Sequence, residues 1–271
     1  MPKTLFAFSL ITVLFAGCAQ NNVTEDNSLK KYFDDTHTSG SFGLFDNGKG
    51  HFTIYNLPRF RDSAYQPAQS FEILLSLIGI QTGVVKNDSS VISRDTVGIH
   101  IKPECDPGLT LKQDFQNGCE VAYQELARRI GKDTLKRWID SLGYGNKNIS
   151  GPADSFWFNN HLKITSDEQL GLAKKLYFDQ LSFFQRTQKI VRSMMLVESN
   201  SNYQLSYKTG WGQREDGRRI GWVVGWIEEN KLPYFFVLNL EPNSADTVTP
   251  EAQIAVLKNI LKQLGFFDGK K

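Results

Sequence analysis

The sequence contains little histidine and little cysteine, which leaves few residues for a metal site. Among its 271 residues there are four histidines, at positions 37, 51, 100 and 161, and three cysteines. Neither the HExxH spacing nor a pair of CxxC spacings, both typical of zinc sites, is present. We therefore expect no metal site and no cofactor.

An excess of one charge is also missing. The 31 Lys and Arg residues nearly balance the 29 Asp and Glu residues, so the formal net charge is only +2. Proteins that bind nucleic acid through its phosphates usually carry a strongly basic surface. We therefore expect no nucleic acid partner, and the sequence leaves the oligomeric state open.

Long hydrophobic runs are absent except near the N-terminus, where "LFAFSLITVLFAG" follows Lys3 and stops at Cys18. This run is shorter than the roughly 20 residues of a membrane-spanning helix and is typical of a signal peptide. We predict a signal peptide over residues 1–17. The ending "LFAGC" resembles a bacterial lipobox, in which the cysteine becomes the lipidated first residue.

A lipidated Cys18 predicts a protein anchored in the bacterial cell envelope, in the periplasm or at the outer membrane. An ordinary secretory signal with a coincidental cysteine is the alternative. The following residues, "AQNNVTEDNS", are polar. We therefore predict a flexible, lipidated tether over residues 18–39 and a folded domain over residues 40–271.

In the predicted envelope location, the other two cysteines, Cys105 and Cys119, would lie in an oxidising compartment. Their separation permits a disulfide, but free cysteine is also common as a small buried residue. Between these alternatives we favour unpaired cysteines.

The pattern of hydrophobic residues predicts an α+β fold. Residues 40–56 resemble a β-hairpin around "DNGKG", and residues 66–190 are mostly helical in character. Three aromatic and β-branched runs near the C-terminus predict an antiparallel meander: "YQLSYKTGWGQ", "RIGWVVGWIEE" and "YFFVLNLE". A final helix begins after Thr249. We expect the terminal strands to share one sheet, with flanking helices and a helical lobe beside it.

Several motifs occur in an order and spacing similar to those of class D β-lactamases. From about residue 40 to residue 265 these are "SLIGIQTGVV", "YQELARRIG", "YGN", "FWFNNHLKIT", "YKTGW" and "GWVVGWIE". The chain therefore resembles this family of penicillin-recognising serine enzymes, which share a transpeptidase-like fold. The resemblance implies an antiparallel sheet with a helical lobe and a site in the seam between them.

The resemblance also implies acyl-transfer chemistry. In the family a serine in S-x-x-K attacks the lactam carbonyl, and the lysine, carboxylated by CO₂, is the general base. A tryptophan, here Trp157, supports that lysine. Backbone N–H groups at the serine and just after the KTG motif bind the oxyanion. The substrate-binding positions would be Val121, Lys208, Thr209, Gly210, Trp211 and Gln253.

This sequence departs from the family where the chemistry takes place. "PAQSFE" places Gln69 at the position of the nucleophile and Glu72 at the position of the base. Ser70 is an alternative nucleophile, but its partner three residues later is Ile73, and its hydroxyl could equally cap or pack the helix start. Cys119 replaces the serine of the S-x-V motif and is either a second alternative nucleophile or an inert thiol.

Two further departures concern ligand binding. Gln253 occupies the position where the family usually has an arginine that binds the substrate carboxylate, so that charged contact would be missing. The family's W-x-x-D turn appears here as Pro103-Glu104-Cys105-Asp106, without the tryptophan.

We interpret the chain as a lipid-anchored pseudoenzyme: a binding or scaffolding relative that lacks efficient hydrolase activity. A β-lactam, a peptidoglycan stem peptide or a partner protein would be its ligand. The alternative is an active β-lactam hydrolase that uses Ser70 or Cys119. A penicillin-sensor domain shares the fold but needs an acylable serine.

Overall fold

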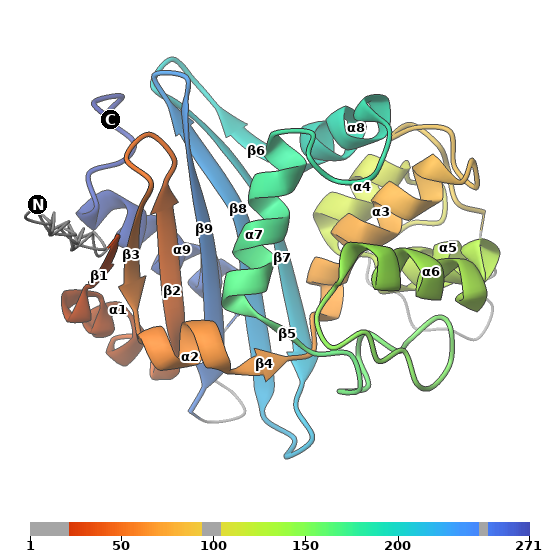
Figure 1. The fold of residues 1–271 in the computed structure, drawn as a ribbon, viewed down its shortest axis with the longest axis horizontal. Coiled ribbons are helices and arrows are strands. Elements are labelled where there is room, and N and C mark those ends of the chain that lie inside the picture. The colour runs from red at the N-terminus through yellow and green to blue at the C-terminus, as the bar shows by residue number, and fades with distance from the viewer. Residues whose placement is uncertain (1–21, 94–103, 244–248) are drawn as a thin grey trace, which may run out of the picture.

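In the computed structural model, which describes residues 22–93, 104–243 and 249–271, strands from both ends of the chain form one sheet (Figure 1). Its order is β1-β3-β2-β9-β8-β7-β6, and only the β1–β3 pair is parallel. The strands are β1 (Val23–Glu25), β2 (Thr38–Asp46), β3 (His51–Tyr55), β6 (Leu196–Ser199), β7 (Tyr203–Gln213), β8 (Arg219–Glu229) and β9 (Leu232–Pro242).

The predicted pairing of the two chain ends is confirmed. Strand β2 lies antiparallel to β9, from the pair Thr38–Pro242 to the pair Asp46–Tyr234. The predicted hairpin is also confirmed, since β2 pairs with β3 and the Asp46 carboxylate accepts a hydrogen bond from the Lys49 N–H at 3.0 Å. The α+β architecture follows from this sheet and its helices.

Helices cover both faces of the sheet and form a lobe beside it (Figure 1). The helices are α1 (Lys30–Asp34), α2 (Leu57–Asp62), α3 (Glu72–Gln81), α4 (Leu111–Asn117), α5 (Glu120–Ile130), α6 (Lys132–Leu142), α7 (Ser166–Tyr177), α8 (Gln185–Met195) and α9 (Pro250–Gln263). Helix α7 packs on one face of the sheet and α9 on the other, while α3 to α6 and α8 form the lobe. Short elements complete the fold: η1 (Asn27–Leu29), η2 (Ala68–Phe71), β4 (Ala64–Tyr65) and β5 (Ile164–Thr165). None of the helices in the described ranges is long and apolar enough to cross a membrane.

The prediction of a flexible tether over residues 18–39 is wrong from Val23 onward. Strand β1 pairs with β3, and the side chains of Leu29 and Phe33 are buried. Phe33 also contacts the Tyr55 ring, with a centroid distance of 4.7 Å. These apolar side chains pack in the core beneath α9, so the folded domain begins before residue 40. Cys18 and the predicted signal peptide lie outside the described residues.

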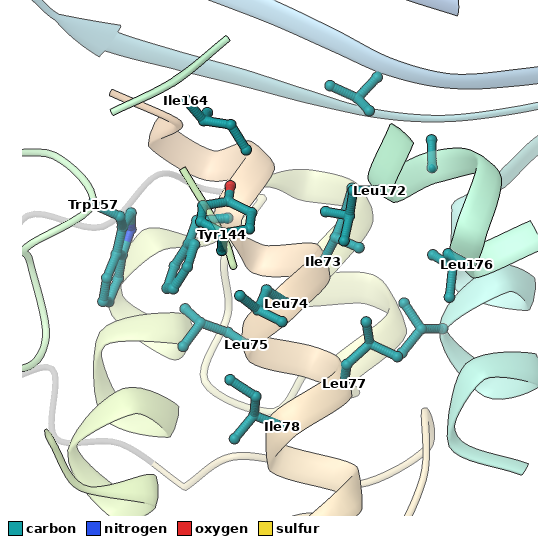
Figure 2. Packing of buried hydrophobic residues seen from close by; sticks show 14 of the residues in the cluster. Ile73, Leu74, Leu75, Leu77, Ile78, Tyr144, Trp157, Ile164, Leu172 and Leu176 are labelled. Carbon is teal, nitrogen blue, oxygen red and sulfur yellow. The ribbon is translucent and has the colours of Figure 1, made fainter. Parts of the chain in front are cut away.

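Helix α3 is buried on every side and forms the centre of the lobe (Figure 2). Five of its apolar side chains are at most 1% exposed and belong to one hydrophobic cluster with Tyr144, Trp157, Ile164, Leu172 and Leu176: Ile73, Leu74, Leu75, Leu77 and Ile78. Burying such a helix fixes its direction, and hence the position of the segment that precedes it. That segment is η2, which contains Gln69 and lies against β7.

Candidate functional site

The site lies where η2 meets β7, in the seam that the sequence predicted. Gly210 permits this close approach, because a Cβ atom there would lie only 2.7 Å from the backbone nitrogen of Ser70. Ala68, just before the expected nucleophile position, has a positive φ of 49°, and its N–H donates to the Trp157 carbonyl oxygen at 3.1 Å. A non-glycine residue rarely adopts this conformation, so the surrounding contacts hold the turn in place.

Gln69 contacts β7 directly. Its side-chain oxygen Oε1 accepts a hydrogen bond from the backbone N–H of Trp211 at 2.6 Å. Trp211 follows the KTG motif, so this is the N–H that the family resemblance assigns to the oxyanion hole. The side chain at the position that the resemblance gives to the nucleophile therefore accepts a hydrogen bond from the N–H that the resemblance gives to the oxyanion hole.

Glu72 forms an ion pair with Lys208. Lys208 Nζ lies 2.8 Å from Glu72 Oε2, and the two side chains are 2% and 0% exposed. Lys208 Nζ also donates to the carbonyl oxygen of Phe115 at 2.8 Å and lies 4.9 Å from the centre of its ring. The positive charge of the KTG lysine is thus balanced from within the protein.

Burial controls the ionisation of Glu72. Loss of water raises the pKa of its carboxyl from 4.5 to about 7, although the positive charge of Lys208 acts in the opposite direction. The negative charges of Glu120 and Asp114 add to the rise. A carboxyl in this environment exchanges its proton near neutral pH.

The hydroxyl of Ser70 forms its hydrogen bonds with Pro67 and Gln169. It donates to the carbonyl oxygen of Pro67 at 2.6 Å and accepts a hydrogen bond from Gln169 Nε2, also at 2.6 Å. The side chain is buried between η2 and α7. These contacts match the packing interpretation of this serine, because neither of them involves a group that could remove its proton.

The prediction of unpaired cysteines is wrong. Cys105 and Cys119 form a disulfide, with their Cα atoms 5.4 Å apart. Cys119 therefore has no free thiol to act as a nucleophile at the S-x-V position. The predicted signal peptide and the separation of 14 residues were the sequence features compatible with this bond.

Trp157 is buried in the lobe, but its indole N–H does not form the contact that the resemblance predicts. The side chain is fully buried, and its rings stack on Phe71 with a centroid distance of 5.5 Å. Its indole Nε1 has no hydrogen-bond partner among the described residues. The resemblance gives this tryptophan the task of supporting a carboxylated lysine, and the shorter Glu72 side chain does not reach the indole N–H.

Four of the predicted substrate-binding residues do not line the cavity beside Lys208: Val121, Gly210, Trp211 and Gln253. Gln253 is fully buried, and neither atom of its amide has a hydrogen-bond partner within the described parts of the chain. It packs behind Trp211, since a Cβ on Gly221 would lie 2.8 Å from Gln253 Nε2 and 2.9 Å from the Trp211 ring. Val121 lies half-buried on the first turn of α5.

A cavity of about 550 Å³ opens beside Lys208 and Thr209. Helices α4 and α9 and strands β6 and β7 supply its other walls, none of which was among the predicted site residues: Phe115, Gln116, Val197, Tyr207, Pro250, Glu251 and Ile254. Most of these side chains are apolar. The sequence motifs identified Lys208 and Thr209 but not the apolar walls, because all of the wall residues except Tyr207 lie outside the motifs.

The contacts of Lys208 determine which chemistry is open to the residues around it. A covalent mechanism needs a hydroxyl or thiol within reach of a base. Among the described residues, Lys208 donates to a main-chain oxygen and pairs with a carboxylate, and no hydroxyl or thiol contacts its ammonium. The described residues also contain no group of three or more His, Cys, Asp or Glu side chains that could hold a metal ion.

Comparison with known proteins gives consistent matches along the chain. Residues 24–263 match the model of the penicillin-binding protein transpeptidase domain. The chain is 33% identical to the β-lactamase OXA-48 of Klebsiella pneumoniae over 88% of both chains. It is 30% identical to the β-lactamase OXA-10 of Pseudomonas aeruginosa, over 88% of this chain and 90% of that protein.

The fold is similar to that of solved class D enzymes. The crystal structure of the class D β-lactamase YbXI from Nostoc superposes with a TM-score of 0.82 and 33% sequence identity. The match covers 89% of this chain and all of that one.

Proposed function

Since the chain belongs to the class D β-lactamase family and carries its penicillin-binding transpeptidase domain, we propose that it is a catalytically impaired member that binds its ligand without hydrolysing it. It would act as a binding or scaffolding protein in the cell envelope. A β-lactam or a peptidoglycan stem peptide is the ligand class that the family suggests.

One observation carries this proposal: Glu72, at the position of the base, is ion-paired with Lys208 and buried with it. A carboxylate has no amine that CO₂ could convert to a carbamate. At the position of the nucleophile, the amide of Gln69 is far too weak a nucleophile for acyl transfer. Losing nucleophile and base together lowers the rate of a serine hydrolase by on the order of a million-fold.

A hydrolysis assay tests the loss of activity. We expect nitrocefin, supplied with bicarbonate, to be hydrolysed no faster than in buffer without the protein, while an active relative measured alongside gives full turnover. Robust turnover that Lys208→Ala abolishes would overturn the proposal.

Intact-mass measurement after incubation with a labelled penicillin separates binding from acylation. We expect reversible binding and no covalent adduct. An adduct mapped to Ser70 or Cys119 would instead support the alternative, an active enzyme with a non-standard nucleophile. The hydrogen bonds of the Ser70 hydroxyl and the disulfide of Cys119 argue against that alternative.

The proposed place in the cell envelope rests on the N-terminal sequence. The lipobox-like "LFAGC" predicts that Cys18 is lipidated after the signal peptide is removed. Growth with labelled palmitate in a bacterial host tests this directly, with Cys18→Ala as the matched control. Label that is retained in Cys18→Ala, or absent from both proteins, would contradict lipidation at this residue.

A further inference from the structure

Gln69 and Glu72 satisfy, from within the chain, the two groups that a ligand would need. A ligand that carries a carbonyl and a carboxylate would meet the Trp211 N–H and the Lys208 ammonium. The side-chain carbonyl of Gln69 already accepts the hydrogen bond from Trp211 at 2.6 Å. The carboxylate of Glu72 already lies 2.8 Å from Lys208.

The hydrogen bond between the Trp211 N–H and Gln69 is of the same kind that a bound ligand would make. The side chain of glutamine ends in a carboxamide, so N–H···O=C is the same hydrogen bond that an amide or lactam carbonyl would make. Only one acceptor can take this N–H with good geometry. A ligand carbonyl and the Gln69 carbonyl are therefore competitors.

Of the two partners, Gln69 is the one free to move. Trp211 is held in β7 by pairing with Gly221 of β8, and the guanidinium of Arg219 lies 4.5 Å from the centre of its indole. Gln69 is only partly buried, at the surface of the seam. Rotation of its side chain toward solvent would release the N–H without moving the backbone.

We infer that Gln69 is an internal ligand of this site: its side-chain carbonyl occupies the Trp211 N–H, and a carbonyl-bearing ligand binds there only after that side chain rotates out. The inference rests on the proposed function, because it concerns the same ligand and the same site. It adds that the unliganded site is closed by its own residue.

Two substitutions separate the hydrogen bond from the bulk of the side chain. Gln69→Met keeps the length and much of the volume but removes the strong acceptor, whereas Gln69→Ala removes both. Gln204→Met is the matched control, because Gln204 is an exposed glutamine on the same strand as Trp211. Circular dichroism and thermal unfolding would establish that all three variants fold.

The first measurement needs no ligand. Hydrogen exchange at the Trp211 amide, followed by NMR, should be about fivefold faster or more in Gln69→Met and in Gln69→Ala, and unchanged in Gln204→Met. The second measurement is calorimetric binding of benzylpenicillin. We expect both Gln69 variants to bind about fivefold more tightly than the wild type, which corresponds to losing one competing neutral hydrogen bond.

The outcomes distinguish this inference from the proposed function. Unchanged exchange at Trp211, together with penicillin binding by the wild type, would overturn the internal ligand and leave the proposed function standing. Faster exchange without penicillin binding in any variant would overturn the proposed ligand and the competition with it. Tighter binding in Gln69→Ala but not in Gln69→Met would show that bulk alone closes the site, and would also overturn the inference.

Discussion

The ammonium of Lys208 lies 2.8 Å from the carboxylate of Glu72, and both side chains are buried. Burying an ion pair removes water from both charges, so its net contribution to stability is small, whereas removing one partner leaves the other buried alone. The pair joins α3 of the helical lobe to β7 of the sheet. It therefore connects the two sides of the seam in which the site lies.

Lys208→Met should destabilise the protein most at alkaline pH. Without the ammonium, the Glu72 carboxylate must stay buried without a partner or take up a proton. We expect a loss of about 3–5 kcal/mol at pH 8, measured by urea unfolding. Adding Glu72→Leu should recover most of that loss, and failure to recover it would show that the lysine acts through packing instead.

The stability of the wild type should fall as pH rises from about 4.5 to 7. Burial raises the pKa of Glu72 from 4.5 to about 7, so in this window the folded protein binds more protons than the unfolded chain. The free energy of unfolding then decreases with rising pH. At 1.36 kcal/mol per pKa unit, the decrease amounts to about 3 kcal/mol.

Glu72→Gln is the control for this pH dependence. The variant cannot ionise at position 72, so its unfolding free energy should change less between pH 4.5 and 7. Urea unfolding at several pH values compares the two proteins. If both curves have the same slope, another group causes the pH dependence.

The disulfide between Cys105 and Cys119 should stabilise the domain by about 3 kcal/mol, as expected for a closed loop of about 15 residues. We expect Cys105→Ser/Cys119→Ser to lower the urea midpoint accordingly. Peptide mapping without reduction should find the two cysteines in one linked fragment. Two separate fragments, both with free thiols, would contradict the bond.

Much of the fold could be predicted because its signals are local. The turn "DNGKG" and the long aromatic strands fix the hairpin and the meander through hydrophobic alternation and turn chemistry. Leu29 and Phe33 escaped prediction for the same reason. Both lie in a mostly polar stretch without a recognisable hydrophobic pattern. Their burial becomes apparent only from their packing in the folded core.

The candidate site was predicted in its residues but not in its contacts. Similarity to the family placed Gln69, Glu72 and Lys208 at one site. It gave no rotamer for Gln69 and no sign that Glu72 pairs with Lys208, since these contacts join positions distant in sequence. The separation of Cys105 and Cys119 permitted a disulfide but could not show that their Cα atoms lie 5.4 Å apart, because that distance depends on how the segment between them folds.

Gly210→Ala should separate η2 from β7. The added Cβ would lie 2.7 Å from the Ser70 backbone nitrogen, and a backbone atom cannot yield as a flexible side chain does. We expect a loss of about 1–3 kcal/mol, as for other overpacked sites. Gly171→Ala is the matched control, because a Cβ atom at this position of α7 would have nothing within 4 Å.

The stability of the control variant, Gly171→Ala, should change in the opposite direction. Alanine in a helix interior is favoured over glycine by about 0.5–1 kcal/mol, so Gly171→Ala should raise the urea midpoint slightly. If Gly210→Ala is as stable as the wild type, the seam is looser than the structure shows.

Restoring the family residues should restore some acylation. Gln69→Ser with Glu72→Lys returns a hydroxyl and an amine to one face of the helix, three residues apart. The indole N–H of Trp157, which has no partner among the described residues, would then meet a carboxylated lysine of the kind the family uses. The carbamate would also return a negative charge beside Lys208, where Glu72 supplies it in the wild type.

Labelled penicillin and ¹³C-bicarbonate NMR measure the two steps of this reconstruction separately. We expect a carbamate signal from any variant with Glu72→Lys, and a covalent penicillin adduct only when Gln69→Ser is also present. Glu72→Lys alone is the control for adduct formation. Replacing both cysteines by serine should increase acylation further, because it returns a hydroxyl to position 119. A double variant that folds and forms the carbamate but is never acylated would mean that the cavity no longer accepts a β-lactam.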